Sequence, residues 1–376
     1  MITVTQRPST TISGETSKWN AVNNPVVYKM TTDEYAQPNY RLEVEVYNAA
    51  NELLNVAFSY LSDPDGDLFV DISTILKSNL LADFDGVLTG VTKTFDDSNV
   101  YLKFYIKYQE VWTGSAESQT NDSANQFFAV LGGNQIPAPY GGNLAEYVTF
   151  NDGGPAAKWL TEFETLKFWR GYPQLVSVIV GDGVGANVFF EAEGDVSTPE
   201  SAAGKILSVD LNNLLTSQDS FQSMDLNLYK DASPDVLLTE TLTITLEDGC
   251  DGQIMLQGRN KRGGVISWMF DVGNEYSFDY GNGIKAARKV LRTSNLTLNQ
   301  WEALQDFITL GPVYRNNIIE LLSTTIKTSS RVGNQVYVID EAGTKTGVVV
   351  IPSTNQTNTR YNKHLFELEI EYPEIL

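Results

Sequence analysis

The sequence predicts a mainly β protein, with tandem antiparallel β-sandwich domains followed by an α+β C-terminal domain with one helix. Most apolar residues alternate with polar ones in short runs separated by Gly, Asn, Asp and Pro, which is typical of antiparallel strands. A segment near residue 70 recurs about 140 residues later, and a helical pattern is clear in one C-terminal segment. A chain of 376 residues can form two or three domains of ordinary size.

Residues 41–47 are the clearest strand. Leu42, Val44 and Val46 alternate with polar or charged residues, so one face of the strand is expected in a core and the other in solvent. The same alternation predicts strands in three further segments. These are residues 100–108, 238–246 and 365–372, the last of which lies near the end of the chain.

A repeated segment indicates a duplicated domain. Residues 70–78, Val-Asp-Ile-Ser-Thr-Ile-Leu-Lys-Ser, match residues 209–217, Val-Asp-Leu-Asn-Asn-Leu-Leu-Thr-Ser, in the position of every apolar residue. Asp71 and Asp210 occupy the same place in the two copies, and each is positioned to cap a short helix. The match predicts two related sandwiches in tandem.

The flanking sequence extends the repeat. At a shift of 140, Trp19 aligns with Trp159, and two strand-like runs follow each tryptophan. The first sandwich is expected to span residues 1–150 and the second residues 155–248, with 249–376 as the C-terminal α+β domain. The strand-like runs are 25–28 and 41–47 in the first copy, and 165–169 and 175–180 in the second.

Two segments depart from the sandwich pattern. Residues 114–142 are rich in Gly, Ser, Asn, Gln and Pro around the apolar residues 127–131, which predicts a long excursion that contacts a neighbouring copy. In the third domain, Thr297 and Gln300 form a capping-box pattern that opens a helix. Its expected apolar stripe is Leu298, Trp301, Leu304 and Phe307 with Ile308, and Gly311-Pro312 is expected to end the helix.

The charge is unevenly distributed. The net charge of −21 comes from 47 acidic and 26 basic residues. Up to Cys250 there are 34 acidic and 13 basic residues, whereas beyond it there are 13 of each. The acidic first two thirds are unfavourable for direct binding of nucleic acid, and the neutral third domain can contact other copies without strong repulsion.

The composition limits the chemistry that the chain can perform. One cysteine and one histidine exclude a disulfide framework and a zinc site within one chain. His364 is predicted in a surface turn, and no catalytic, metal-binding or cofactor-binding residue is assigned. Asp63-Pro-Asp-Gly-Asp67 predicts a hairpin turn, with a structural cation as the alternative. No leader pattern and no membrane-spanning apolar run is expected from the sequence.

Four segments carry a recognisable pattern. Residues 249–270 read as a turn, a strand, a Gly-Gly hairpin and an aromatic strand, and Leu-Gly-Pro-Val-Tyr at 310–314 follows the predicted helix. Residues 363–372 read as a closing strand, and the opening at residues 17–28 has Asn-Pro before the first strand. In these segments the chain resembles the structural tail, baseplate and neck-ring proteins of phages of Bacteroidetes hosts, including crAss-like phages.

The resemblance implies a structural virion component that forms an oligomeric ring or adaptor in a tail, neck or baseplate, with no enzymatic activity. Its partners would be copies of itself and other virion tail or portal proteins, with no sequence-specific nucleic acid binding and no membrane, and it would be made in the host cytoplasm. The subunit-interface candidates are Phe127, Phe128, Val130, Lys285, Arg288, Lys289 and Arg292. The alternative is a carbohydrate-binding or adhesin-type β-sandwich, suggested by six Trp and 18 Tyr.

Overall fold

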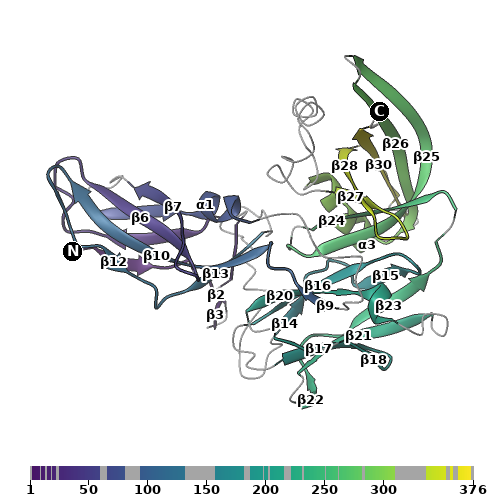
Figure 1. Cartoon of the computed structure of the whole chain (residues 1–376), viewed down its shortest axis with the longest axis horizontal. Coiled ribbons are helices and arrows are strands. Elements are labelled where there is room, and N and C mark those ends of the chain that lie inside the picture. Colours follow the sequence, from purple (N-terminus) through teal and green to yellow (C-terminus); the bar gives the residue numbers. More distant parts are fainter. Residues whose placement is uncertain are drawn as a thin grey trace. The chain divides into compact units, whose positions relative to one another are not determined.

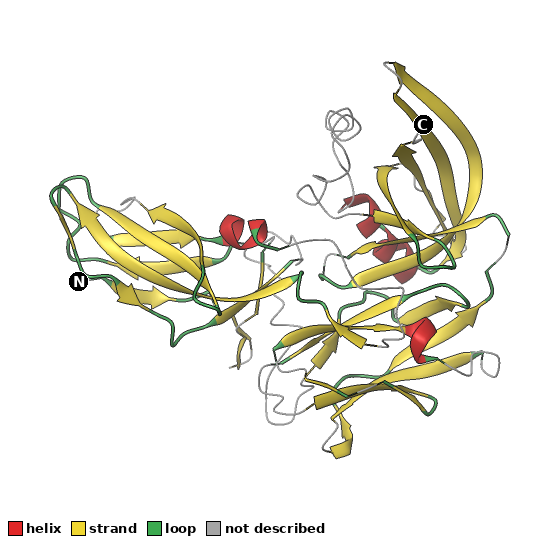
Figure 2. Cartoon of the chain, in the orientation of Figure 1, coloured by secondary structure: helices red, strands yellow, loops and turns green. Residues whose placement is uncertain are grey.

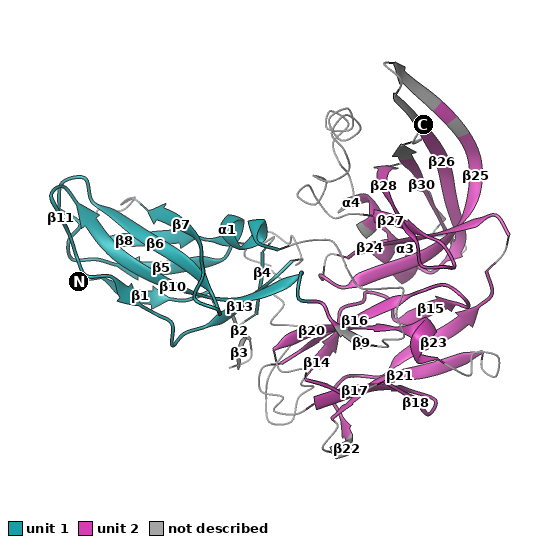
Figure 3. Cartoon of the chain, in the orientation of Figure 1, with its two compact units in different colours: residues 1–81, 98–154 teal, residues 82–97, 155–376 magenta. Residues whose placement is uncertain are grey.

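The computed structural model forms two compact units (Figure 3). The first comprises residues 1–81 and 98–154, and the second comprises residues 82–97 and 155–376. Strands make up most of the regular structure, and the helices are short (Figure 2). The structure describes residues 2–8, 10–12, 15–17, 19–22, 25–59, 66–80, 94–131, 157–181, 187–197, 199–201, 204–215, 222–230, 233–249, 251–260, 262–281, 284–309, 336–352, 356–358 and 363–373.

The first unit is a sandwich of a three-stranded and a five-stranded sheet (Figure 1). The smaller sheet has the order β1 (Thr3–Gln6), β5 (Val27–Thr31), β8 (Asp67–Asp71). The larger has the order β4 (Trp19–Ala21), β13 (Phe127–Val130), β10 (Tyr101–Trp112), β6 (Arg41–Asn48), β7 (Leu53–Ser59), and β11 (Ser115–Ala116) and β12 (Thr120–Asn121) also pair with β10. β2 (Thr10–Ile12) and β3 (Glu15–Ser17) form a separate hairpin.

Alternation in β6 places its apolar residues in the core, as predicted. Leu42, Val44 and Val46 are fully buried. The two sheets meet where Tyr28 of β5 lies edge-on to Phe127 of β13, with ring centroids 6.4 Å apart. Among the described strand pairs of this unit, β4 and β13 are parallel and the others are antiparallel.

The second sandwich has the same strand order as the first. Its smaller sheet has the order β14 (Ala157–Trp159), β16 (Leu175–Val180), β20 (Lys205–Asp210), β9 (Thr94–Asp96). The larger has the order β15 (Thr165–Trp169), β23 (Leu242–Glu247), β21 (Ser223–Lys230), β17 (Asn187–Ala192), β18 (Asp195–Val196), with β19 (Glu200–Ser201) beside β17 and β22 (Ser233–Leu237) beside β21. Here too one pair, β15 with β23, is parallel.

The repeated segment occupies equivalent places in the two sandwiches. β8 leads into α1 (Ser73–Ser78), and β20 leads into α2 (Leu211–Leu214). Asp71 accepts a hydrogen bond from the backbone N–H of Ser73 (2.9 Å), and Asp210 accepts the corresponding bond from Asn212 (3.0 Å). Asp210 is the N-cap of α2, as predicted, whereas the N-cap of α1 is Ile72 and Asp71 lies one residue before it.

The predicted alignment of Trp19 with Trp159 is wrong, because the two tryptophans lie in strands that are not equivalent. Trp19 lies in β4, which pairs in parallel with β13, and the strand with that pairing in the second sandwich is β15 rather than β14. The strand equivalent to β14 is β1, which precedes Trp19 in the chain. The runs that follow are displaced in the same way, so that β5 corresponds to β16 and β6 corresponds to β17.

The predictions for residues 63–67 and for residues 114–142 also need correction. Residues 63–67 do not close a hairpin, because β7 and β8 on either side belong to different sheets; residues 60–65 lie outside the described part of the chain. The predicted excursion 114–142 is in part built into the first sandwich, since β11, β12 and β13 all pair with β10. Residues 132–142 lie outside the description.

One strand of the second sandwich comes from an unexpected part of the chain. β9 lies between α1 and β10 of the first sandwich, yet it pairs with β20 along the edge of the smaller sheet of the second. Asp97 continues this pairing by donating its backbone N–H to the carbonyl of Ile206 (2.9 Å). The second sandwich is therefore completed by a segment from within the sequence of the first.

The C-terminal strands close into an antiparallel barrel of six strands. Their order is β24 (Gln253–Arg259), β25 (Val265–Gly281), β26 (Ile284–Leu296), β30 (Lys363–Pro373), β28 (Lys345–Pro352) and β27 (Val336–Ile339), which pairs again with β24. β29 (Gln356–Asn358) adds to β30. In Figure 1, β25 and β26 form a long curved ribbon.

The predicted helix packs against the barrel. α3 (Leu298–Leu304) begins with the predicted capping box of Thr297 and Gln300, and α4 (Asp306–Thr309) follows it. Leu304 and Phe307 are buried, with the Phe307 ring 6.0 Å from that of Phe270, whereas Leu298 is 48% exposed and is not part of the buried stripe. Residues 310–314 lie outside the description.

The surface-turn prediction for His364 is wrong. The imidazole is 4% exposed, because β30 has already begun at Lys363 and lies between β26 and β29 at this point. Trp301 of α3 covers it, with ring centroids 6.1 Å apart. The chain's histidine thus belongs to the barrel core.

The second sandwich and the barrel share one hydrophobic core within the second unit. The core cluster runs from Trp159 and Phe190 of the sandwich to Phe270 and Phe366 of the barrel. The ring of Trp268 in β25 contacts Phe163 and Trp169 at centroid distances of 5.4 and 5.2 Å. The expected division at residues 248 and 249 separates two sets of strands, but the described chain divides into two compact units.

Candidate functional site

A buried ion pair joins the end of β9, the strand that completes the second sandwich, to the barrel. Asp97 directly follows β9, and Arg259 is the last residue of β24. The guanidinium donates from Nη1 to Oδ2 of Asp97 (2.5 Å) and from Nη2 to Oδ1 (2.8 Å). The two side chains are 3% and 1% exposed, so the pair is screened from solvent. Such a bidentate contact fixes the relative orientation of the two side chains as well as the distance between them.

Hydroxyl groups extend this contact across the sheet. Ser208 of β20 donates to Asp97 Oδ2 (3.4 Å), and its hydroxyl lies 2.8 Å from that of Ser177 in β16. The backbone N–H of Val265 in β25 donates to the Ser177 hydroxyl (3.2 Å). The barrel therefore contacts this sheet at two places, Asp97 after β9 and Ser177 of β16, and Ser208 of β20 links them.

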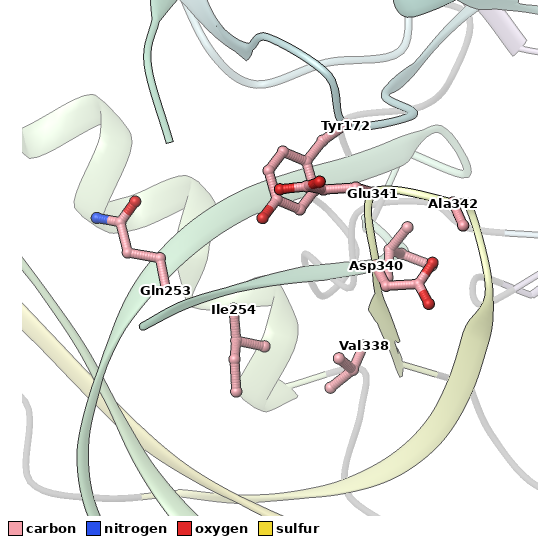
Figure 4. Close-up of a pocket in the computed structure, with 8 residues that line it drawn as sticks. Tyr172, Gln253, Ile254, Val338, Asp340, Glu341 and Ala342 are labelled. Atoms are coloured by element: carbon pink, nitrogen blue, oxygen red, sulfur yellow. The ribbon is translucent and has the colours of Figure 1, made fainter. Parts of the chain in front are cut away.

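A groove of about 420 Å³ opens in the second unit at the start of β24, the opposite end of that strand from Arg259 (Figure 4). Tyr172, from the turn between β15 and β16, forms one wall. The start of β24 and the turn after β27 supply the rest, and Figure 4 shows the Glu341 carboxylate beside the Tyr172 ring. The lining residues are Tyr172, Gln253, Ile254, Val338, Ile339, Asp340, Glu341 and Ala342.

The groove has an acidic rim. Burial, followed by the carboxylate of Glu341, raises the pKa of Tyr172 above its ordinary value, and Asp251 and Asp340 act in the same direction. Asp340 also accepts the backbone N–H of Thr344 (2.7 Å), which closes the turn at the end of β27. No lysine, histidine or cysteine is among the lining residues. The groove's chemistry suits a basic side chain or an amine.

The three aromatic and aliphatic interface candidates lie in β13 of the first sandwich. Phe127, Phe128 and Val130 are all buried in this fold. Phe128 stacks on Trp19 with ring centroids 4.4 Å apart, and Phe127 packs on Phe104 and Tyr28. Their contact with another copy stays a prediction, and it would require β13 to leave its own sheet.

The basic interface candidates face carboxylates of their own barrel. Arg288 is ion-paired with Glu371 (2.5 Å) and lies 3.7 Å from Glu369, because β26 and β30 are paired strands. Arg292 forms an ion pair with Glu367, which lies on β30 like Glu369 and Glu371. Lys289 lies 3.3 Å from Glu275 of β25. The side chain of Lys285 is outside the description. A contact with an acidic neighbouring copy stays a prediction and would compete with these pairs.

Sequence reasoning missed the residues that the structure brings together here. β24 carries Arg259 into a buried position beside Asp97. Arg262, three residues further along the chain, lies 3.5 Å from Glu162. The signal for the groove was Asp340-Glu-Ala-Gly343, a turn pattern that places two carboxylates together.

Two negative results apply to the described ranges. They contain no group of three or more His, Cys, Asp or Glu residues arranged to hold a metal ion. They also contain no helix that is both long and apolar enough to cross a lipid bilayer.

Comparison with known proteins adds little to the fold itself. No family model matches the chain, and no curated protein matches it. Among solved structures, a chimeric titin Z1Z2-Z1Z2 tandem carrying a GRGDS peptide from fibronectin aligns at 9% identity with a TM-score of 0.17, over 66% of this chain and 100% of the other. A complex of Dpr2 Ig1-Ig2 with DIP-Theta Ig1-Ig3 aligns at 7% with a TM-score of 0.20, over 100% and 90%. Neither score supports an argument, so the fold is assigned from strand order.

Proposed function

We propose that this chain is a structural virion component that assembles, with copies of itself and other tail or portal proteins, into a ring or adaptor of a phage tail, neck or baseplate. The proposal starts from the sequence resemblance at residues 249–270 and 363–372. These residues form β24, β25 and β30, which are three of the six barrel strands.

The observation that carries the proposal is the strand interlock. β9 comes from inside the first sandwich's sequence, pairs with β20 of the second, and is held by the buried pair of Asp97 and Arg259. Breaking such an arrangement requires exposure of a paired strand and of two charges, which is costly. An interlock of this kind is favourable in a protein that transmits force or maintains a fixed geometry.

The polar contacts of the described side chains support the same role. The buried charges Asp97, Arg259, Arg288 and Glu371 all serve contacts between strands. A protein with a mechanical role needs such contacts between strands, whereas an enzyme needs titratable groups gathered around a substrate cavity.

Electron microscopy of the purified full chain and of its parent particle tests the proposal. We expect closed assemblies with one fixed copy number, formed through head-to-tail contacts. Native mass spectrometry of the same sample gives that number. A chain that stays monomeric at every concentration, together with a particle that lacks a multi-copy ring of it, would refute the proposal.

The carbohydrate-binding alternative has one observation in its favour, namely exposed aromatic rings in the first sandwich. Tyr35, Phe58 and Phe69 are 49%, 54% and 50% exposed. Arg41 lies over the Phe58 ring at 5.8 Å and Lys29 over the Phe69 ring at 5.5 Å, so one face of each ring is already in contact. Glycan-array binding by the monomer, abolished by Phe58→Ala or Phe69→Ala, would favour this alternative.

A further inference from the structure

We propose that β7, the outermost strand of the five-stranded sheet in the first sandwich, pairs antiparallel with β7 of a second copy of this chain. The two sheets would join edge to edge across a two-fold axis. The inference depends on the first unit alone and does not rest on the proposed ring.

β7 is an unprotected edge. Among the described strands it pairs with β6 alone. Its seven residues, Leu-Leu-Asn-Val-Ala-Phe-Ser, contain no charge and no proline. An open strand of this kind is a template for pairing with another chain, and natural proteins usually block it with lysine, proline or a short length.

The other free edges of the described sheets are blocked in those ways. Most are five residues or shorter, and the longer outer half of β25 carries Glu275 and Asp279. β15 contains Lys167, and β22 contains Pro234 and Asp235. β7 is therefore the exception among them.

The duplicated sandwich provides an internal comparison. The strand that corresponds to β7 in the second sandwich is β18 (Asp195 and Val196), and β19 (Glu200 and Ser201) continues the same edge along β17. That edge carries two carboxylates, and Pro199 interrupts it. The equivalent edge of the duplicated sandwich is therefore blocked by charge and proline, whereas β7 has neither.

The backbone of β7 is oriented for pairing. The N–H of Asn48 donates to the carbonyl of Glu52 (3.0 Å), so the backbone groups of Asn48, and of every second residue before it, point from β6 toward β7. Val56 and Phe58 lie opposite residues of β6 that do not point toward β7. Their own N–H and C=O groups therefore point to the open edge. The side chain of Asn55 accepts the N–H of Val56 (2.8 Å), and this local bond would be exchanged for one to the partner strand.

The side chains beside this edge are apolar. Leu53 and Phe58 are 51% and 54% exposed. They lie opposite Tyr47 and Glu43 of β6 on the outer face of the sheet, and the Tyr47 ring stacks on Tyr105 at 5.5 Å. Antiparallel pairing would bring the apolar residues of two copies together, and cross-strand pairs of this type stabilise sheets.

Charge identifies a second copy as a suitable partner. The first unit has 15 acidic and seven basic residues, so most of its surface repels another copy. β7 is an uncharged segment of that surface. Glu43 and Glu45 on β6 of one copy would be about 14 Å from β6 of the other at ordinary strand spacing, which exceeds the screening length of about 8 Å at physiological salt.

The test uses the full chain and two variants, Phe58→Lys and Leu53→Lys. Both side chains are more than half exposed, so the fold of the monomer is expected to survive. The matched control is Val196→Lys, which places the same charge on the equivalent edge at 50% exposure. Sedimentation velocity measures association, and hydrogen exchange measures protection of the Phe58 amide as protein concentration rises.

We expect protection of the Phe58 amide to rise with concentration in the unmodified chain. Phe58→Lys and Leu53→Lys should each weaken association at least tenfold, and Val196→Lys should leave it unchanged. Association without protection of Phe58, or equal association in all variants, would overturn the pairing. Multi-copy rings that persist in Phe58→Lys with an unprotected edge would overturn it while leaving the proposed function intact.

Discussion

Gly66 lies directly against the backbone carbonyl of Thr32. A Cβ atom at Gly66 would be 2.4 Å from that oxygen, and the residue has a φ of +83°. The N–H of Thr32 donates to the carbonyl of Gly66 (3.1 Å), which draws the two segments together. The Thr32 hydroxyl in turn donates to Glu110, which is fully buried and also accepts a bond from Tyr40 (2.9 Å).

Gly66→Ala is therefore expected to destabilise the first unit by about 2–5 kcal/mol, because left-handed backbone strain adds to a clash with backbone that must shift. Gly114→Ala is the matched control. Gly114 has a φ of +79° but nothing within 4 Å of the new Cβ, so strain alone should cost about 1–2 kcal/mol.

Hydrogen exchange of first-unit peptides in increasing urea measures both losses in the full chain. Equal losses in the two variants would show that the contact with Thr32 has no energetic effect.

Asp97→Ala should destabilise the second unit by about 3–5 kcal/mol, since it leaves the Arg259 guanidinium buried without its partner. The effect should be greatest in β9 and β20, which the pair holds together. Exchange of the Phe95 and Ser208 amides, which lie on paired residues, is the local measurement.

Two controls define the cause of that loss. Asp248→Ala removes a carboxylate that is 80% exposed and pairs with Arg170, so it should cost less than about 1 kcal/mol. The double variant Asp97→Leu with Arg259→Met removes both charges and should recover much of the stability. If the double variant is as unstable as Asp97→Ala, the buried unpaired charge is not the cause.

Local patterns predicted much of this fold. Alternation placed Leu42, Val44 and Val46 in the core, and the capping box at Thr297 placed the start of α3. These features depend on neighbours a few residues apart, which a sequence displays directly. The duplicated aspartates were found for the same reason.

The sequence did not predict which strands and side chains far apart in the chain pair with one another. β9 is three residues long, and nothing in Thr94-Phe-Asp96 indicates which sheet receives it. The pair of Asp97 and Arg259 spans 162 residues, and one charge in each of two polar segments does not identify the other. His364 was misplaced because its polar neighbours suggested a turn, whereas closure of the barrel buries it.

Asp210 and Asp71 occupy the same place in the repeat but have different surroundings, and the stability of the second unit should depend on pH through Asp210. Asp71 is exposed, whereas Asp210 is 3% exposed. Burial raises the pKa of Asp210 from 3.8 to about 6, against the opposing effect of the N–H groups that it accepts.

Because the folded-state pKa of Asp210 is the higher one, the folded chain holds this proton more tightly than the unfolded chain does. The favourable contribution is complete below pH 4 and is lost as the pH rises through about 6. Asp210→Asn keeps an acceptor for the N–H of Asn212 and removes the titration. Its stability relative to the unmodified chain should therefore rise by roughly 2–3 kcal/mol between pH 3 and pH 7.

Asp71→Asn is the control for Asp210→Asn, because it changes the same position of the other copy at an exposed site. Urea unfolding of the second unit at several pH values, followed by hydrogen exchange, gives the comparison. A flat difference between Asp210→Asn and the unmodified chain across this range would contradict the prediction, because desolvation of the buried carboxyl opposes its ionisation and requires a slope.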